Sequence, residues 1–406
     1  MNIFTNTLHN GLRIIHLQTS SPVAYCGFAI NVGARDEQPA EHGLAHFVEH
    51  TIFKGTIRRR AWHILNRMEN VGGDLNAYTT KENTFVYSTF MEKDFERAVE
   101  LLSDLIINSQ FPDNEMIKER EVILDEIQSY EDSPSELIFD DIEDMVFDGH
   151  QLGHNILGNR RSLKTFDSQA GKSFLKRFYT APNIVFFSMS STDFKRITRL
   201  AEKYFAAIPS QSPSITRQRP EITKPRQEEI KKKTHLTHVA VGGRGYDLHD
   251  PNKYTLFLLN NILGGPGMNS RLNVSLREKH GLVYNVESNA TSYSDTGIFV
   301  IYLGTDPKNR DKAISLVEKE LANIRDNKLT TLQLSAAKKQ AIGQLGVASD
   351  NRENLFLGIG KSFLHLNRYF PLEEEFRKIE AITADQILEV ANEILEPSRL
   401  SRLIFY

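Results

Sequence analysis

The stretch DLNAYTTKENTFVYSTFM, residues 74–91, consists of two runs of β-forming residues joined by a polar turn. It predicts a pair of antiparallel strands. Apolar residues then recur at helical spacing, which predicts a helix with one buried face. That face contains Phe95, Ala98, Val99, Leu102, Leu105 and Ile106.

The same order recurs in the second half of the chain. LVYNVESNATSYSDTGIFVIYLGT, residues 282–305, again reads as two β-runs, and a helical pattern follows it. Each half also begins with a strand-like segment, GLRIIHL at 11–17 and THVAVGG at 237–243. Strand and helix signals do not alternate strictly, so we predict an α+β fold with two similar domains. Each domain would be a mainly antiparallel β-sheet covered by helices.

A proline-rich polar segment separates the two halves. Residues 206–234 contain four prolines and almost no apolar periodicity, as is typical of a linker. We therefore predict a first domain at 1–215, a linker at 216–234 and a second domain at 235–406.

The bulk properties exclude several classes of protein. The 406 residues carry a net charge of −3, so there is no basic footprint for nucleic acid. No apolar run approaches the roughly eighteen residues of a membrane span, and the N-terminus lacks the pattern of a signal peptide. Cys26 is the single cysteine, which excludes an internal disulfide and fits a reducing compartment. These features predict a cytoplasmic location.

HFVEH, residues 46–50, is the strongest chemical signal. On a helix His46 and His50 lie one turn apart on the same face, where both imidazoles can reach one Zn²⁺. Glu49 adjoins His50 and can act as a base beside the metal without binding it. The alternative is a structural helix that happens to contain two histidines.

A catalytic zinc needs a third protein ligand. The helical pattern EREVILDEIQSYEDSP, residues 119–134, places Glu119 and Glu126 two turns apart on one face. Glu126 could bind the metal while Glu119 holds a ligating histidine. Acidic residues on such a helix are otherwise usually a solvated face.

HFVEHTIFKGT, GGDLNAYTTKENT and EREVILDEIQSYEDSP together resemble the pitrilysin-type, or inverzincin, zinc metallopeptidases. The half-length branch that includes the mitochondrial processing peptidases is the most similar. Glu126 follows His50 by 76 positions, where this resemblance expects the third zinc ligand. Glu119 matches the outer-shell glutamate of the family.

In the second half, LREKHGLVY at 276–284 resembles a family motif whose arginine and tyrosine contact the substrate carbonyl. The resemblance implies these roles for Arg277 and Tyr284, which would otherwise read as surface or packing residues. It also places Asn76 and Ala77 on a sheet edge that binds an extended peptide, although Asn76 could instead make a local turn hydrogen bond.

The resulting prediction is a zinc-dependent peptidase with one Zn²⁺ per chain and Glu49 as general base. It would hydrolyse unfolded peptides or small polypeptides inside a closed clamshell chamber. In full-length members of the family that the chain resembles, two such units face each other around the substrate. The resemblance therefore implies that this half-length chain closes the same chamber as a homodimer, with composite active sites completed by the partner's Arg277 and Tyr284. A heterodimer with a related subunit is the alternative assembly. The alternative functions are a non-catalytic scaffold subunit and a module that binds peptides without cutting them.

GGPGMNSRL, residues 264–272, is rich in glycine but lacks the Lys-Ser/Thr ending of a P-loop. We interpret the Gly264–Gly267 segment as a flexible loop rather than a phosphate site.

Overall fold

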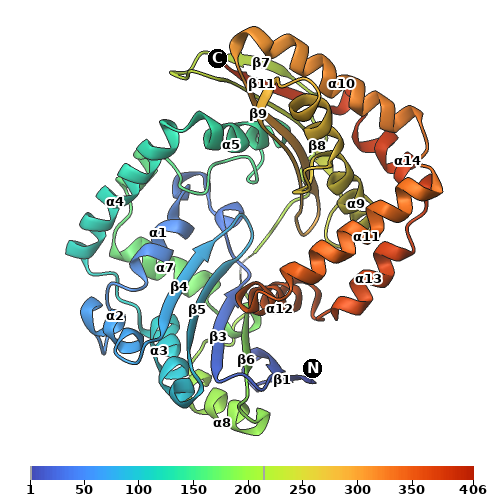
Figure 1. Ribbon diagram of the computed structural model, residues 1–406. Coiled ribbons are helices and arrows are strands. Elements are labelled where there is room, and N and C mark those ends of the chain that lie inside the picture. Colours follow the sequence, from blue (N-terminus) through green and yellow to red (C-terminus); the bar gives the residue numbers. More distant parts are fainter. Residues whose placement is uncertain (1, 214) are drawn as a thin grey trace. The chain divides into compact units, whose positions relative to one another are not determined.

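The computed structural model describes residues 2–213 and 215–406, which form two compact units (Figure 1). The first unit consists of the chain up to Ile127 together with His154–Arg217 and Ser349–Tyr369. The second unit consists of Gln128–Gly153, Gln218–Ala348 and Phe370–Tyr406.

The first unit is built on a six-stranded sheet in the order β1-β2-β6-β3-β5-β4. All neighbouring strands are antiparallel except β2 and β6, which are parallel. The hairpin predicted at residues 74–91 is confirmed, because β4 and β5 pair from Asp74 with Thr89 to Thr79 with Thr84. The strands are β1 (Asn2–Thr7), β2 (Arg13–Gln18), β3 (Val23–Ile30), β4 (Asp74–Thr79), β5 (Thr84–Met91) and β6 (Ile184–Ser190).

Helices cover this sheet. The helix predicted after the hairpin is confirmed as α3 (Phe95–Asn108), and every residue of its predicted apolar face is buried. It packs against β3, β5 and α8 (Phe194–Phe205). The first half of the chain contributes further helices of four or more residues to this unit. They are α1 (Leu44–Thr51), α2 (Ala61–Glu69), α4 (Asp113–Glu131), α6 (Arg160–Leu163) and α7 (Ser168–Phe178).

The second unit repeats this design with a five-stranded sheet in the order β7-β11-β8-β10-β9. Only the β7–β11 pair is parallel. The hairpin predicted at 282–305 is β9 (Val283–Ser292) and β10 (Gly297–Thr305), and the helix after it is α10 (Arg310–Asp326). The other strands are β7 (Gln227–Ile230), β8 (Thr237–Gly245) and β11 (Ser401–Phe405).

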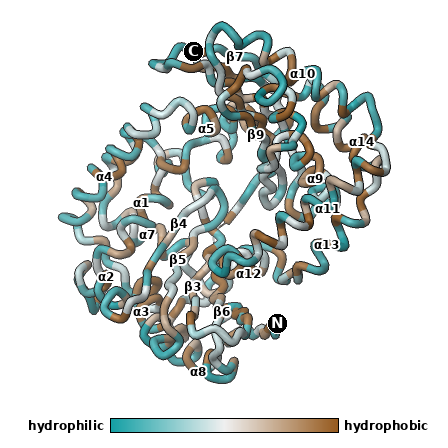
Figure 2. Tube along the Cα trace, viewed as in Figure 1, coloured by the Kyte–Doolittle hydropathy of each residue, from teal (hydrophilic) through white to brown (hydrophobic). Residues whose placement is uncertain are grey.

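One face of the second sheet packs against helices α9, α10 and α14, and apolar side chains from the sheet and these helices form a single core. The helices of four or more residues that follow β8 in this unit are α9 (Lys253–Gly264), η5 (a π-helix, Asn273–Glu278), α10, α11 (Thr331–Ala348), α13 (Leu372–Glu380) and α14 (Ala384–Ile394). Figure 2 shows that hydrophobic stretches gather on the strands and on the helices that contact them. Mainly antiparallel sheets covered by helices confirm the predicted α+β class.

Each unit also contains a helix from the other half of the sequence. In the first unit, α12 (Arg352–Leu366) packs on β6 and β3, and Gly360 lies so close to Phe187 that an added Cβ would be 2.8 Å from its ring. In the second unit, α5 (Pro134–Val146) packs on β8, where an added Cβ at Gly242 would be 3.0 Å from Ile142. The predicted domain boundaries place α5 in the first domain and α12 in the second, so they do not account for this exchange of helices between the units.

Near its start, the predicted linker is held to the first unit by an ion pair. Arg217 pairs with Asp36 at 2.8 Å, next to the buried Arg35–Glu82 ion pair of 2.6 Å. The chain then forms β7, one of the two edge strands of the second sheet. Among the described residues, no helix is both long enough and apolar enough to cross a bilayer.

Candidate metal centre

Helix α1 carries His46, Glu49 and His50, and a buried carboxylate holds its first turn. Glu37, only 1% exposed, accepts hydrogen bonds from the backbone N–H of Gly43 at 2.9 Å and of Ala45 at 2.7 Å. These are donors that a helix start leaves without intrahelical partners. Since the start of α1 is fixed in this way, the direction in which its side chains project is fixed as well.

Gly43 precedes the helix in a left-handed conformation, with φ of +96°. A Cβ at this position would lie 2.6 Å from the carbonyl oxygen of Leu157, so glycine is required by both the backbone angle and the available space.

The structure brings together the three side chains that the sequence nominated as ligands. Glu126 Oε2 lies 3.7 Å from His46 Nε2 and 3.8 Å from His50 Nε2. Bonds of roughly 2.0–2.2 Å to a tetrahedral ion separate two ligand atoms by about 3.3–3.6 Å. All three ligand atoms lie within 4.8 Å of one another, so a small contraction would let them bind one cation such as Zn²⁺.

The hydrogen bonding of these side chains also fits a metal. Glu126 Oε2 is buried and has no hydrogen-bond partner among the described residues, although its two neighbours are histidine nitrogens. A buried carboxylate oxygen is seldom left in this state, and a cation at the centre of the trio would satisfy it. Within the described part of the chain, this is the one group of three such side chains that converges closely enough to hold a metal.

Glu119 lies behind His50. Its Oε2 is 3.3 Å from His50 Nδ1, and its Oε1 pairs with Lys54 Nζ at 2.7 Å. A carboxylate that accepts from Nδ1–H leaves the Nε2 lone pair free to face the trio. Helix α4 supplies both Glu119 and Glu126, two turns apart on one face. Lys54, which holds Glu119 in place, was not singled out from the sequence.

Burial shapes the protonation of the site. It lowers the pKa of His46 to about 3, with a further contribution from nearby His50, so His46 is the neutral imidazole that a metal requires. Burial also raises the pKa of Glu49, whereas hydrogen bonds with Thr79 and the proximity of His50 oppose this rise. Glu49 is therefore a carboxylate whose basicity is enhanced beside the trio.

Asn76 and Ala77 lie on β4, the edge strand of the first sheet, and α1 contacts this strand. The Asn76 amide donates to Asp74 Oδ2 at 2.7 Å, a local hydrogen bond of the kind that the sequence left open. Among the described strands β4 pairs with β5 alone, so within this part of the chain its other edge has no strand beside it.

Arg277 and Tyr284 belong to the second unit, and their relation to the trio stays a prediction. Arg277 is exposed at the end of η5 and lines a hollow of about 320 Å³ together with the Gly264–Gly267 loop. Tyr284 lies on the edge strand β9 with 62% of its surface exposed, and its hydroxyl donates to Asp306 Oδ1 at 3.3 Å.

Two family models match the chain. Residues 13–160 match the model described as insulinase (peptidase family M16), and residues 165–341 match the peptidase M16 inactive domain. Among solved structures, the chain resembles a peptidase M16 inactive domain from Pseudomonas fluorescens, with a TM-score of 0.92 and 21% identity over 100% of this chain and 98% of that one. A protease from Helicobacter pylori gives a TM-score of 0.91 and 19% identity over 100% and 99% of the two chains. Both likenesses show the same fold.

Curated relatives match along almost their whole length. An uncharacterized zinc protease of Bacillus subtilis, YmxG, is 30% identical over 96% of this chain and 94% of its own. An uncharacterized zinc protease of Rickettsia felis is 32% identical over 99% and 97%. The beta subunit of the mitochondrial-processing peptidase of Saccharomyces cerevisiae is 29% identical over 98% and 89%. With this identity over the full length, and with both family models matched in order, the chain belongs to peptidase family M16.

Proposed function

We propose that this protein is a zinc-dependent peptidase that hydrolyses peptide bonds in unfolded peptides or small polypeptides. The observation that carries the proposal is the convergence of His46, His50 and Glu126 beside the partly buried carboxylate of Glu49. Membership of family M16 supports it, as do the names of the relatives. The class of activity is that of a metalloendopeptidase or oligopeptidase.

The trio would hold one Zn²⁺ per chain. Three protein ligands are the number found in catalytic zinc sites, which keep a fourth position for water or substrate. When bound, zinc supplies a Lewis acid that polarises the scissile carbonyl and lowers the pKa of a water molecule to about 7. Glu119 would keep His50 in the tautomer that such a site needs.

Glu49 is the base in this proposal. It lies next to His50 in the sequence without belonging to the trio, and burial raises its pKa above the ordinary value of a glutamate, which makes it a stronger base. It would accept a proton from the attacking water and deliver it to the amine of the leaving peptide. Its hydrogen bonds with Thr79 tie the base to β4, the strand proposed to bind substrate.

The edge of β4 would bind the substrate. An extended peptide can pair with an unpartnered strand through backbone N–H and C=O groups, which gives affinity with little dependence on side chains. Asn76 and Ala77 lie on this strand, which α1 contacts. This mode of binding requires an extended chain, and it therefore favours unfolded peptides over folded proteins.

Arg277 and Tyr284 would donate hydrogen bonds to the carbonyl oxygen as negative charge develops there. We infer that a homodimer supplies them, with each zinc site completed by the partner subunit inside a closed chamber. The exposure of Tyr284 supports this, since a tyrosine that contacts substrate has to be accessible. A heterodimer with a related subunit would serve the same purpose.

Incubation of the zinc-loaded protein with a library of unstructured peptides, followed by mass spectrometry, tests the proposal. We expect cleavage that a chelator abolishes and that added zinc restores. A scaffold subunit would produce no chelator-sensitive cleavage. A module that only captures peptides would retain them intact, with no new termini in the spectra.

A further inference from the structure

Lys54 lies four positions after His50, in the turn that follows α1. Its backbone N–H donates to the carbonyl oxygen of Thr51 at 3.0 Å. The same turn is tied to the end of α3, because Ser109 Oγ donates to the carbonyl oxygen of Ile52 at 3.2 Å. The backbone that carries Lys54 is therefore held in place next to the metal centre.

The side chain of Lys54 pairs with the carboxylate of Glu119. Its Nζ lies 2.7 Å from Glu119 Oε1, and the two side chains are only 26% and 12% exposed. An ion pair on an open surface is weakened by water and salt, whereas a partly buried pair is screened much less. The second oxygen of the same carboxylate, Oε2, lies 3.3 Å from His50 Nδ1. Each oxygen of Glu119 therefore has its own partner on one short segment of the chain.

This arrangement fixes the orientation of the Glu119 carboxylate. A glutamate side chain has several rotatable bonds, and the torsion of its terminal carboxylate is broad, so one contact alone would leave it free to turn. With Oε1 held by Lys54, Oε2 faces the ring of His50. A carboxylate in this position accepts from Nδ1–H and directs Nε2 toward a metal. The orientation of His50 therefore depends on two links, Lys54 to Glu119 and Glu119 to His50.

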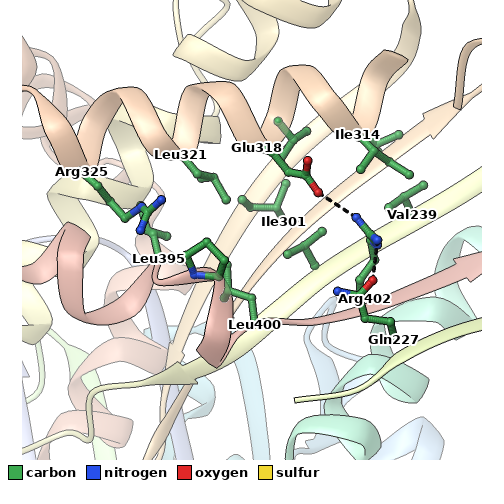
Figure 3. Close-up of a pocket in the computed structure, with 14 residues that line it drawn as sticks. Gln227, Val239, Ile301, Ile314, Glu318, Leu321, Arg325, Leu395, Leu400 and Arg402 are labelled. Carbon is green, nitrogen blue, oxygen red and sulfur yellow. Dashed lines mark hydrogen bonds and ion pairs between the residues drawn. The ribbon is translucent and has the colours of Figure 1, made fainter. Parts of the chain in front are cut away.

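Two other ion pairs of similar length lack the second link. Arg402 pairs with Glu318 at 2.9 Å, at one end of a cavity of about 90 Å³ beneath α10 (Figure 3). Lys118 pairs with Glu115 on α4 at 2.7 Å. Within the part of the chain that the structure describes, neither carboxylate contacts a histidine. The Lys118 pair lies on the helix that carries Glu119, so it is a matched control.

We propose that Lys54 is a positioning residue for zinc, which acts through Glu119 to orient His50 and so raises the affinity of the trio for the metal. This inference rests on the proposed zinc site. The positive charge of Lys54 by itself repels a cation, so the gain in affinity comes from the orientation of Glu119. Lys54 should therefore have no favourable effect on zinc binding once Glu119 is removed.

Zinc affinity, measured on the full chain by competition with a chromophoric chelator, tests the proposal. Lys54→Met keeps the aliphatic part of the side chain and removes the ammonium group. It should weaken zinc affinity about 5-fold or more, but by no more than the roughly 10–100-fold loss expected when the hydrogen-bond partner of a ligand is replaced. Lys54→Arg retains a charged donor and should recover most of the affinity. Lys118→Met should bind zinc as tightly as the unmodified protein. An unchanged or higher affinity in Lys54→Met would overturn the proposal.

A double-mutant cycle separates action through Glu119 from a general structural effect. Lys54→Met should cause no further loss of zinc affinity when it is added to Glu119→Ala. Equal losses with and without Glu119 would show that Lys54 acts by another route, which would also overturn the proposal. If Lys54→Met fails to fold, Lys54→Gln takes its place in the same cycle. A protein that shows the expected zinc affinities but cleaves no peptide would contradict the proposed function and leave the role of Lys54 standing.

Discussion

His50 Nδ1 lies 3.3 Å from Glu119 Oε2, and the other oxygen of Glu119 pairs with Lys54 at 2.7 Å. Glu119 is thus held from one side and holds His50 from the other. Glu119 contacts His50 at Nδ1, whereas Glu126 Oε2 faces the Nε2 atoms of both histidines. The two glutamates therefore have different roles. Two carboxylates of one helix should therefore differ sharply in their effect on metal binding.

Glu126→Gln should lose most of its zinc, because it replaces an anionic ligand atom of the trio. Glu119→Gln should weaken zinc affinity less, by roughly 10–100-fold, as replacing the hydrogen-bond partner of a ligand typically does. Zinc content after dialysis against a graded series of chelator concentrations measures both effects. The assignment is reversed if Glu119→Gln releases zinc more readily than Glu126→Gln.

Glu37→Ala should destabilise the first unit and loosen the metal site. The change leaves the N–H groups of Gly43 and Ala45 buried without their acceptor, at a cost of about 2 kcal/mol or more in the free energy of unfolding. Glu41→Ala is the control, since Glu41 makes a partly exposed ion pair with Arg177, which is worth at most about 1 kcal/mol. Urea unfolding of the metal-free variants compares them. Similar losses in the two variants would mean that Glu37 has no special role at the start of α1.

The metal-free protein should lose stability in acid. Burial is the main cause of the lowered pKa of three histidines in the first unit, to about 4 for His16, about 3 for His46 and about 4 for His365. Below pH 6.5 the unfolded chain binds protons that the folded chain does not. Each such group lowers the free energy of unfolding by about 1.4 kcal/mol per pH unit until its folded-state pKa is reached.

Denaturant unfolding at pH 7, 6 and 5 measures this slope. His16→Asn removes one titrating group, so the slope between pH 6 and 5 should become shallower in that variant. A stability that is flat from pH 7 to 5 would show that these histidines are protonated in the folded state.

Complementation tests the shared active sites of the proposed homodimer. Glu49→Gln and Tyr284→Phe should each be nearly inactive alone. In a mixed dimer one site carries both changes and the other carries neither. Random exchange makes about half of the dimers mixed, so activity should return to roughly a quarter of the unmodified value. If activity stays absent after subunit exchange has been confirmed by mass spectrometry, each chain completes its own site.

Local patterns in the sequence could predict much of this structure. The strand runs around Asp74–Thr79 and Thr84–Met91 and the apolar face of α3 depend on periodicity, which one segment reveals by itself. The spacing of His46 and His50, and that of Glu119 and Glu126, likewise follow from helix geometry.

Features that depend on tertiary partners could not be predicted in this way. The apolar faces of α5 and α12 show that each helix is buried, but not against which sheet, and each packs in the unit formed mainly by the other half of the chain. Glu37 has no local signal, because an acidic residue six positions before a backbone N–H is not a recognised cap. The pairing of β7 with β11 joins residues far apart in sequence, inside a segment whose composition is that of a linker.

Turnover by Glu49→Gln at full zinc occupancy tests the central claim most directly. Glutamine preserves the size of the side chain and leaves His46, His50 and Glu126 intact, but it cannot accept the proton of the attacking water. We predict that the variant binds one zinc per chain, as measured by metal analysis, and cleaves a library peptide several orders of magnitude more slowly than the unmodified protein. Near-normal cleavage by the fully zinc-loaded variant would contradict the role of Glu49 as the base.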